Sequence, residues 1–197
     1  MRSKKQKRKI RLGLLLIGCS LCLGAWNLWE ERRAARVSRE ALAALEEQRT
    51  EQETQQPQPQ LPPDLVMPTV VVDGMEYIAT VEIPKLELSL PIGSRWSEDA
   101  LHQAPCRYQG SLYTGDLIVA GHNYRKHFGR LSHLCIGDEI YVTDMIGNRF
   151  AYLVSSVEEL PGTAIEEMAA GDWELTLFTC TASGSHRVTI RCKQQGG

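Results

Sequence analysis

The sequence predicts an all-β domain, and three observations lead to this fold class. From about residue 66 onward, short β-branched or alternating runs follow one another between turn signals. Two of these turns carry dipeptides that favour hairpins, Asp73-Gly74 and Gly147-Asn148. Only two brief stretches, 97–105 and 163–171, look helical. We therefore expect residues 66–197 to form one β domain, closed as a barrel because closure removes exposed strand edges.

The expected strands alternate their side chains between two faces, so that each run gives one row of core residues. In chain order they are TVVV (69–72), YIATVEI (77–83), LELSLPI (86–92), DLIVAGH (116–122), DEIYVTD (138–144), RFAYLVSSVEEL (149–160), WELTLFTC (173–180) and HRVTIRCK (186–193).

A basic tail and an apolar segment begin the chain. Residues 1–11 carry seven Lys and Arg and no acid, whereas the whole chain has a net charge of −2. Residues 12–29 are 18 uncharged residues, and a helix of that length spans roughly 27 Å, near the thickness of a bilayer core. We expect a single-pass membrane anchor with a cytoplasmic N-terminus and an extracellular domain. The alternative is a cleaved signal peptide, whose apolar region is usually shorter and ends in small residues.

A helical stalk and a linker, residues 30–65, connect the anchor to the β domain. Residues 30–52 are rich in Ala, Glu, Arg and Leu and contain no Gly or Pro, which favours a helix. The segment TQQPQPQLPPD (54–64) reads as an extended linker. We expect a spacer that keeps the domain away from the membrane. The residues after the basic tail are acidic overall, which argues against nucleic acid as a partner.

The six cysteines and the absence of cofactor motifs limit the chemistry. Cys106, Cys135 and Cys192 lie in the exported part, where they are either buried thiols or one disulfide plus a free thiol. No His/Cys cluster has zinc-site spacing, and no glycine-rich phosphate loop follows a strand. We therefore expect no metal and no required cofactor, and the sequence leaves open whether calcium modulates the domain.

Cys180 is the candidate nucleophile, because it ends an apolar strand at the mouth of a turn. Arg187 begins the next run, and if the two runs pair antiparallel the two residues lie across the turn from each other. Arg191 shares the face of Arg187 but lies four residues further on, roughly 13 Å away. Arg187 is therefore the better candidate to act beside the cysteine.

A cysteine nucleophile also needs a proton donor for its leaving group, and histidine suits that role near neutral pH. Among five histidines, His122 is the best candidate because it follows Gly121 at the end of an apolar strand. The chain order, His before Cys, is the reverse of that in papain-like peptidases. Asn123 and Thr179 flank the two catalytic candidates and are candidate substrate-binding residues.

Five segments in the right order resemble the sortase family. TLFTC (176–180) is similar to its nucleophile strand, HRVTI (186–190) to the strand that bears its arginine, and IVAGHN (118–123) to its histidine segment. VEIPKLELSLPI (81–92) resembles the opening strands, and LSHLCIGDEIYVTD (131–144) the hairpin after the histidine. The resemblance covers about residues 77–193.

The resemblance implies an eight-stranded β-barrel with catalytic residues His122, Cys180 and Arg187. It also implies a Gram-positive cell-wall transpeptidase that cleaves surface proteins at an LPxTG-like signal and transfers them, through a thioester, to an amine of a peptidoglycan precursor. The chain has neither an Asp-Pro-aromatic lid before the barrel nor a second transmembrane segment, which argues against a pilus-polymerising type. Two alternatives stay open, a cysteine hydrolase without amine transfer and an anchored, non-catalytic β-barrel binding module.

Overall fold

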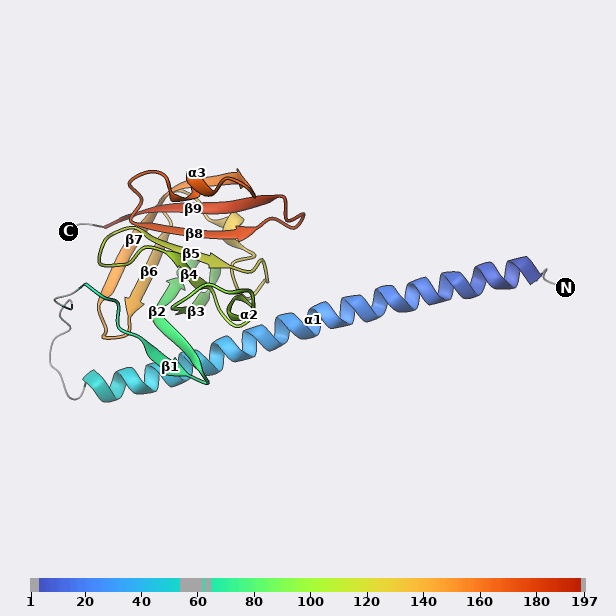
Figure 1. Ribbon diagram of the computed structural model, residues 1–197, viewed down its shortest axis with the longest axis horizontal. Coiled ribbons are helices and arrows are strands. Elements are labelled where there is room, and N and C mark those ends of the chain that lie inside the picture. Colours follow the sequence, from blue (N-terminus) through green and yellow to red (C-terminus); the bar gives the residue numbers. More distant parts are fainter. Residues whose placement is uncertain (1–3, 54–61, 63–64, 196–197) are drawn as a thin grey trace. The chain divides into compact units, whose positions relative to one another are not determined.

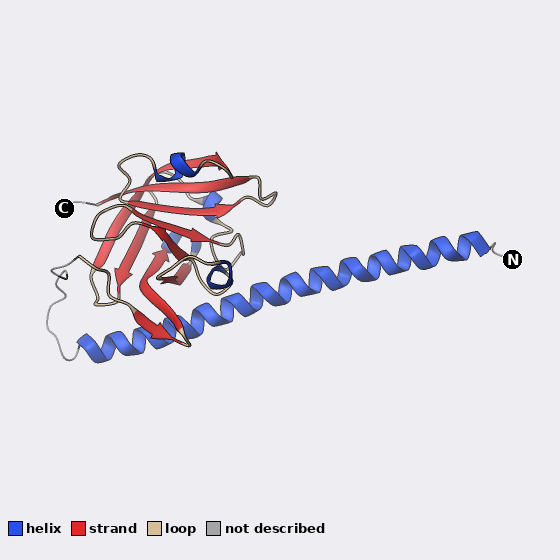
Figure 2. Cartoon of the chain, in the orientation of Figure 1, coloured by secondary structure: helices blue, strands red, loops and turns tan. Residues whose placement is uncertain are grey.

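The computed structural model describes residues 4–53, 62 and 65–195, in two compact units, Met1–Arg33 and Ala34–Gly197. Figure 2 shows that most regular structure outside the long helix α1 is strand. The helices are α1 (Lys4–Glu53), α2 (Glu98–Leu101) and α3 (Ile165–Ala169), with short 3-10 turns η1 (Pro84–Leu86) and η2 (Leu131–His133). The strands are β1 (Val70–Val72), β2 (Met75–Ile83), β3 (Leu88–Gly93), β4 (Cys106–Gln109), β5 (Leu117–Gly121), β6 (Glu139–Asp144), β7 (Arg149–Pro161), β8 (Leu175–Cys180) and β9 (His186–Gln194).

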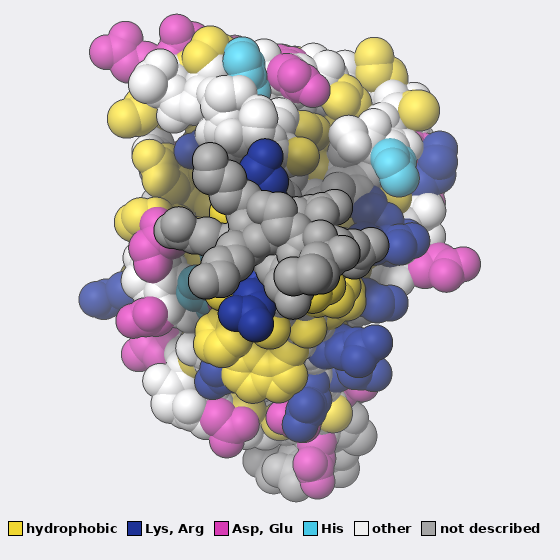
Figure 3. All heavy atoms as spheres, turned by 90° about the vertical axis from the view of Figure 1, so that its right-hand side faces the viewer, with side chains coloured by type: hydrophobic (Ala, Val, Ile, Leu, Met, Phe, Trp, Pro, Cys, Tyr) yellow, Lys and Arg dark blue, Asp and Glu magenta, His cyan; other side chains and the backbone are white. Residues whose placement is uncertain are grey.

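The first unit is helical and presents its apolar side chains outward. Leu14, Leu21 and Trp26 are 64%, 69% and 64% exposed. In the space-filling view of Figure 3, hydrophobic side chains are visible among Lys, Arg, Asp and Glu side chains of the face shown. Among the described residues, one helix is long and apolar enough to cross a membrane, and it lies near the N-terminus. Such continuous apolar exposure fits a lipid environment better than water.

The second unit contains a closed barrel of eight strands. The hydrogen-bonded order is β2-β3-β4-β5-β8-β9-β7-β6, and a pairing of β2 with β6 closes the ring (Figure 1). The predicted eight-stranded barrel with short helices is thus confirmed. The strand β1 pairs with β2 outside this ring. The short strand β4, which the sequence did not predict, takes its place between β3 and β5.

The barrel interior is filled by the inward-facing residues of the strands. Ile83, Ile92, Leu117, Leu177 and Ile190 are all 0% exposed and belong to one continuous core. Removing a side chain of this size from water stabilises the fold by about 1.5–3 kcal/mol. The core therefore fixes the strands against one another, and with them the residues at their ends.

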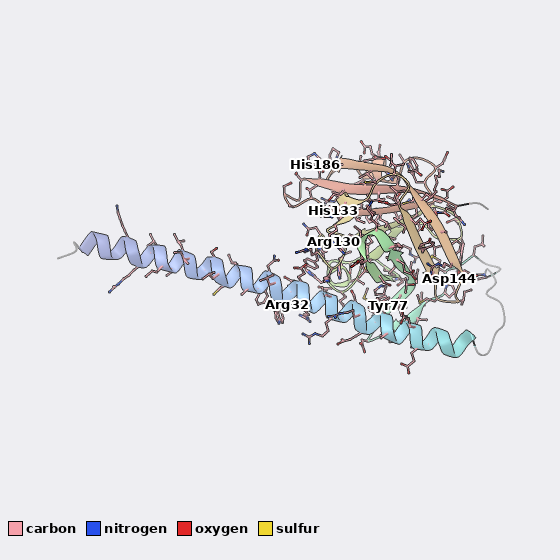
Figure 4. The ribbon with its side chains drawn as sticks, turned by 180° about the vertical axis from the view of Figure 1, so that it is seen from behind. Arg32, Tyr77, Arg130, His133, Asp144 and His186 are labelled. Carbon is pink, nitrogen blue, oxygen red and sulfur yellow. The ribbon has the colours of Figure 1, made fainter. Side chains whose placement is uncertain are left out.

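Both predicted hairpin turns are present. The turn between β1 and β2 places Asp73 at φ 50° and Gly74 at φ 80°, the left-handed pair that a two-residue hairpin requires. In the β6–β7 turn, Asp144 Oδ1 accepts hydrogen bonds from the backbone N–H groups of Ile146 (3.0 Å) and Asn148 (2.8 Å). Figure 4 shows Asp144 on the side of the barrel away from His186, so this buried acid supports a hairpin far from the β8–β9 turn.

The part of α1 that belongs to the second unit packs against the barrel. Its buried residues recur at helical spacing along one face, as expected for an amphipathic helix: Ala34, Ser38, Ala41 and Leu45. Ala41 and Leu45 share a hydrophobic cluster with Tyr77 of β2. The predicted boundaries of tail, anchor, stalk and domain stay predictions, and the Pro/Gln linker lies almost entirely outside the described residues.

Candidate active site

Three neighbouring strands bring the candidate catalytic positions to one end of the barrel. The strands β5 and β8 run parallel with Gly121 opposite Thr179, and His122 and Cys180 are the next residues on each chain segment. The strands β8 and β9 run antiparallel with Cys180 directly opposite Arg187. The predicted pairing of Cys180 with Arg187 across the turn is therefore confirmed. Three adjacent strand ends thus carry an imidazole, a thiol and a guanidinium.

Gly121 leaves no room for a side chain just before His122. A Cβ atom at this position would lie 2.6 Å from Cδ2 of Phe128, which is fully buried. Phe128 in turn donates its backbone N–H to the carbonyl of His122 at 3.1 Å. The loop after β5 therefore folds back on the strand end, and this contact fixes where the backbone of His122 lies.

His122, Cys180 and Arg187 line the same cleft, which has a volume of about 310 Å³. The cleft is mainly apolar, and its other lining residues come from the loop that contains α2, from β4, from β8 and from the segment around α3. They include Trp96, Glu98, Tyr108, Phe178, Ile165 and Met168. An apolar cleft with a few convergent polar groups is typical of a binding or active site.

The Arg187 guanidinium is oriented by the turn between β8 and β9. Its Nη1 donates to the carbonyls of Gly184 (3.0 Å) and His186 (3.2 Å). Within the same turn, the hydroxyls of Ser183 and Ser185 lie 2.7 Å apart. Arg187 is half-buried and borders the cleft, so its side chain can reach a bound molecule there.

Arg191 has different surroundings, although it shares a strand face with Arg187. It is 2% exposed, and its Nη1 donates to the carbonyl of Met168 at 2.6 Å while its Nη2 donates to that of Glu167 at 2.6 Å. Burial lowers the pKa of Arg191, and the nearby carboxylate of Glu158, 3.7 Å away, opposes this shift. Arg191 therefore fastens α3, one wall of the cleft, to the barrel.

Aromatic and imidazole rings gather around His122. The ring centroids of His102 and Tyr124 lie 4.7 Å and 4.8 Å from that of His122. Nδ1 of His102 lies 2.9 Å from the hydroxyl of Tyr124. The sequence drew attention to His102 only as one of five histidines, and it gave no reason to select Tyr124. These contacts join residues that are up to 22 positions apart, so no local pattern reveals them.

His127 is the buried member of this ring cluster. Its ring lies 5.6 Å from that of Tyr124, and its Nε2 lies 3.2 Å from Oγ of Ser38 on α1. Burial, and then the positive charge that His122 can carry, lowers the pKa of His127 to about 4. His127 is therefore neutral at physiological pH.

All six cysteines are free thiols, so no disulfide forms among Cys106, Cys135 and Cys192. Burial raises the pKa of Cys106 and of Cys192 to about 12 in each case. Of the two alternatives for these cysteines, buried thiols are found for Cys106 and Cys192, whereas Cys135 is an exposed thiol in the segment before β6. Cys180 is half-buried and is the cysteine that borders the cleft.

Asn123 and Thr179, the candidate substrate-binding residues, are not among the described residues that line the cleft. Asn123 is exposed, whereas Thr179 is buried with 3% of its surface exposed. Their role in substrate binding stays a prediction. His186 pairs with Pro161 at the start of β9, and its Nδ1 lies 3.0 Å from the hydroxyl of Ser185, outside the ring cluster.

The comparisons with known proteins agree on one family. The family model of the sortase domain matches residues 81–195 of the sequence, which is more than half of the chain. No curated protein matches the chain. Among solved structures, sortase C1 of Streptococcus agalactiae, in complex with MTSET, is 25% identical, with 61% of this chain and 70% of that chain covered and a TM-score of 0.55.

Two further solved structures show the same fold at lower identity. The sortase D5 transpeptidase of Clostridium perfringens is 20% identical, with 82% of this chain and 99% of that chain covered and a TM-score of 0.61. Sortase A from Corynebacterium diphtheriae is 21% identical, with 79% of this chain and 84% of that chain covered and a TM-score of 0.55. The fold is thus shared with several sortase classes.

Proposed function

Because the chain belongs to the sortase family, we propose that it is a cysteine transpeptidase that cleaves an LPxTG-like sorting signal after the threonine. The observation that carries this proposal is the strand register, which aligns Cys180 with Arg187 and sets His122 beside them at one cleft. The cleft is mainly apolar, which suits the side chains of a bound peptide segment.

In the first half of the reaction, the Cys180 thiolate attacks the carbonyl carbon of the substrate threonine. The tetrahedral intermediate collapses as the carbon–nitrogen bond to the following residue breaks. The imidazolium of His122 gives its proton to the departing amine, and a thioester remains on Cys180. Arg187 hydrogen-bonds the substrate or the developing oxyanion, which is worth a few kcal/mol in a site that excludes water.

In the second half, an amine of a cell-envelope precursor attacks the thioester. Neutral His122 accepts a proton from this amine, the carbon–sulfur bond breaks, and the Cys180 thiolate is released with an amide as product. Water can take the place of the amine, and the product is then a free carboxylate.

The proposed location is the cell membrane of a Gram-positive cell. The apolar helix of the first unit supports a single-pass anchor, and the basic residues that precede it support a cytoplasmic N-terminus. The barrel then lies outside the cell, where surface proteins that bear an LPxTG-like signal and amine acceptors meet. No metal or cofactor takes part in the proposed reaction.

The direct test uses the full-length protein in detergent and a fluorogenic LPxTG peptide, with and without triglycine or a diaminopimelate-type amine. We expect cleavage in both cases and an amide product when the amine is present. Cys180→Ala should show no cleavage above background, because the alanine provides no nucleophile. The exposed thiol of Cys135 gives the matched control, and Cys135→Ala should cleave like the wild type.

Each outcome of this assay has one meaning. Cleavage without any amide product would favour a cysteine hydrolase over a transpeptidase. Absence of cleavage by the wild type would favour a binding module, and full activity in Cys180→Ala would remove Cys180 from the mechanism.

A further inference from the structure

The rings of His102, His122 and Tyr124 form a compact triangle at the edge of the cleft. The centroid separations are 4.7 Å between His102 and His122, 4.8 Å between His122 and Tyr124, and 6.3 Å between His102 and Tyr124. The hydrogen bond between Nδ1 of His102 and the Tyr124 hydroxyl closes this triangle at 2.9 Å. The imidazole of His122 therefore packs against two rings that are themselves tied together.

This arrangement limits the orientation of the His122 ring. Rotation of the His122 ring away from its present position would break its contacts with both neighbours. A cation near the face of an aromatic ring is favoured, so the ring of Tyr124 can stabilise His122 when it is an imidazolium. The hydrogen bond between His102 and Tyr124 holds the two neighbouring rings together.

A second layer of contacts supports the triangle from α1. Ser38 Oγ donates to the backbone carbonyl of Gln103, the residue after His102, at 2.7 Å. A serine hydroxyl has a single proton, so the same oxygen accepts the Nε2–H of His127 at 3.2 Å. His127 packs against Tyr124 with 5.6 Å between ring centroids. Ser38 is 1% exposed. It therefore links Gln103, next to His102, with His127, which packs against Tyr124.

We propose that His102 and Tyr124 are positioning residues for His122, and that Ser38 of α1 supports them through Gln103 and His127. The proposal rests on the proposed function, because it assigns these residues a role in the proton transfer by His122. The residues Ser38 and Gln103 act at a distance from the reacting atoms. A proton donor must be held in register with the leaving group, and a small misplacement of such a group lowers the rate strongly.

The test is a double-mutant cycle of Tyr124→Phe and His102→Phe in the full-length protein. Each change keeps a ring of similar size and removes the hydrogen bond between the two side chains. We expect each single variant to lose about 5- to 10-fold in kcat with KM unchanged, and the double variant to lose no more than the worse single variant. Losses that multiply in the double variant, or wild-type kcat in both single variants, would overturn the proposal.

The contribution of α1 is tested with Ser38→Ala. We expect a loss of about 3-fold in kcat with KM unchanged, because the neutral His127 loses its hydrogen-bond acceptor. Glu40→Ala is the matched control, since Glu40 lies two residues away on the exposed face of the same helix and should keep wild-type kinetics. Equal kinetics of Ser38→Ala and Glu40→Ala would remove Ser38 from the network.

A readout without substrate separates this proposal from the proposed function. In NMR spectra of histidine-labelled protein, the ring resonances of His122 should move in Tyr124→Phe and in His102→Phe, and should move again only slightly in the double variant. If the wild type cleaves no peptide, the proposed function fails, but these resonances still decide whether the network orients His122. Unmoved His122 resonances in both single variants would contradict the network.

Discussion

Cys180 differs from the buried barrel cysteines in its access to the cleft. Cys106 and Cys192 are fully buried, and burial holds their thiols protonated by raising each pKa to about 12. A thiol in that state is a poor nucleophile, because the thiolate is the reactive form. Cys180 ends its strand instead of sitting within it, so the barrel supports its backbone and leaves its sulfur at the cleft.

The two arginines of β9 should separate activity from stability. Arg187→Ala should lose about 100- to 1,000-fold in kcat/KM, because it removes a hydrogen-bond donor at the site of developing charge. It should leave the melting temperature nearly unchanged, since Arg187 is half-buried and, among the described residues, hydrogen-bonds the nearby carbonyls of Gly184 and His186. Peptide cleavage and thermal unfolding of the full-length variant measure the two effects.

Arg191→Ala is the matched comparison, and we expect the reverse pattern. Loss of the Arg191 guanidinium leaves the carbonyls of Met168 and Glu167 without their hydrogen-bond donor, which should lower the melting temperature. The activity per folded molecule should fall far less than in Arg187→Ala. Equal losses of activity in the two variants would show that the assignment of Arg187 is wrong.

At the scale of secondary structure, periodicity and turn residues predicted most strands and both hairpins. Alternation is a strong signal where one face of a strand is buried, and Asp73-Gly74 supplies the left-handed backbone that the first turn needs. The strand β4 escaped prediction because it has four residues, and of these only Cys106 is buried. Such a short run becomes a strand through its neighbours β3 and β5 and not through its own pattern.

The site was predictable only where it depends on strand ends. His122, Cys180 and Arg187 each lie at the terminus of a strongly patterned strand, so the sequence indicates that they lie at the same end of the barrel. His102 and Tyr124 lie in irregular segments, and their contact with His122 depends on how α2 and the loop after β5 fold onto the barrel. No spacing in the sequence encodes that contact.

The packing of helix α1 against the barrel is another feature that the sequence did not predict. From the sequence, residues 30–52 are expected to form a helix that, together with the Pro/Gln linker, acts as a spacer. The structure buries Ser38, Ala41 and Leu45 on one face of this helix, and Ala41 and Leu45 pack in a cluster with Tyr77 and Met145. Small residues suffice on this helix face because the helix lies close to the barrel.

At the scale of the whole molecule, the compact unit begins at Ala34 and not at the first strand. The helix segment after Ala34 reaches the loop that follows His122 through the contact of Ser38 with His127. Its helix face and the barrel bury a common set of side chains. The matched sortase domain, residues 81–195, is therefore smaller than the unit that packs together.

This unit should lose stability when the pH falls from about 7 to about 5. The pKa of His127 is about 4 in the folded protein, against an ordinary value of 6.5. Between pH 4 and pH 6.5 the unfolded state binds more protons at this residue than the folded state does. The free energy of unfolding therefore rises with pH over this range and decreases as the pH falls. The contribution of His127 over this range is about 2 kcal/mol, and melting temperatures at the two pH values measure it.

His127→Gln is the control for this pH dependence. The glutamine amide can still donate to Ser38, but it does not titrate. The variant should lose less stability than the wild type between the two pH values. An equal loss in both proteins would show that His127 is not the group responsible.

The central claim is that Cys180 carries the acyl group of a cleaved peptide, and mass spectrometry of the acid-quenched protein tests it most directly. After incubation with an LPxTG peptide and no amine, the full-length protein should gain the mass of the peptide up to its threonine, less one water. The added mass should map to the fragment that contains Cys180 and disappear when triglycine is added. Cleavage of the peptide with no adduct in the wild type, together with cleavage by Cys180→Ala, would contradict the account.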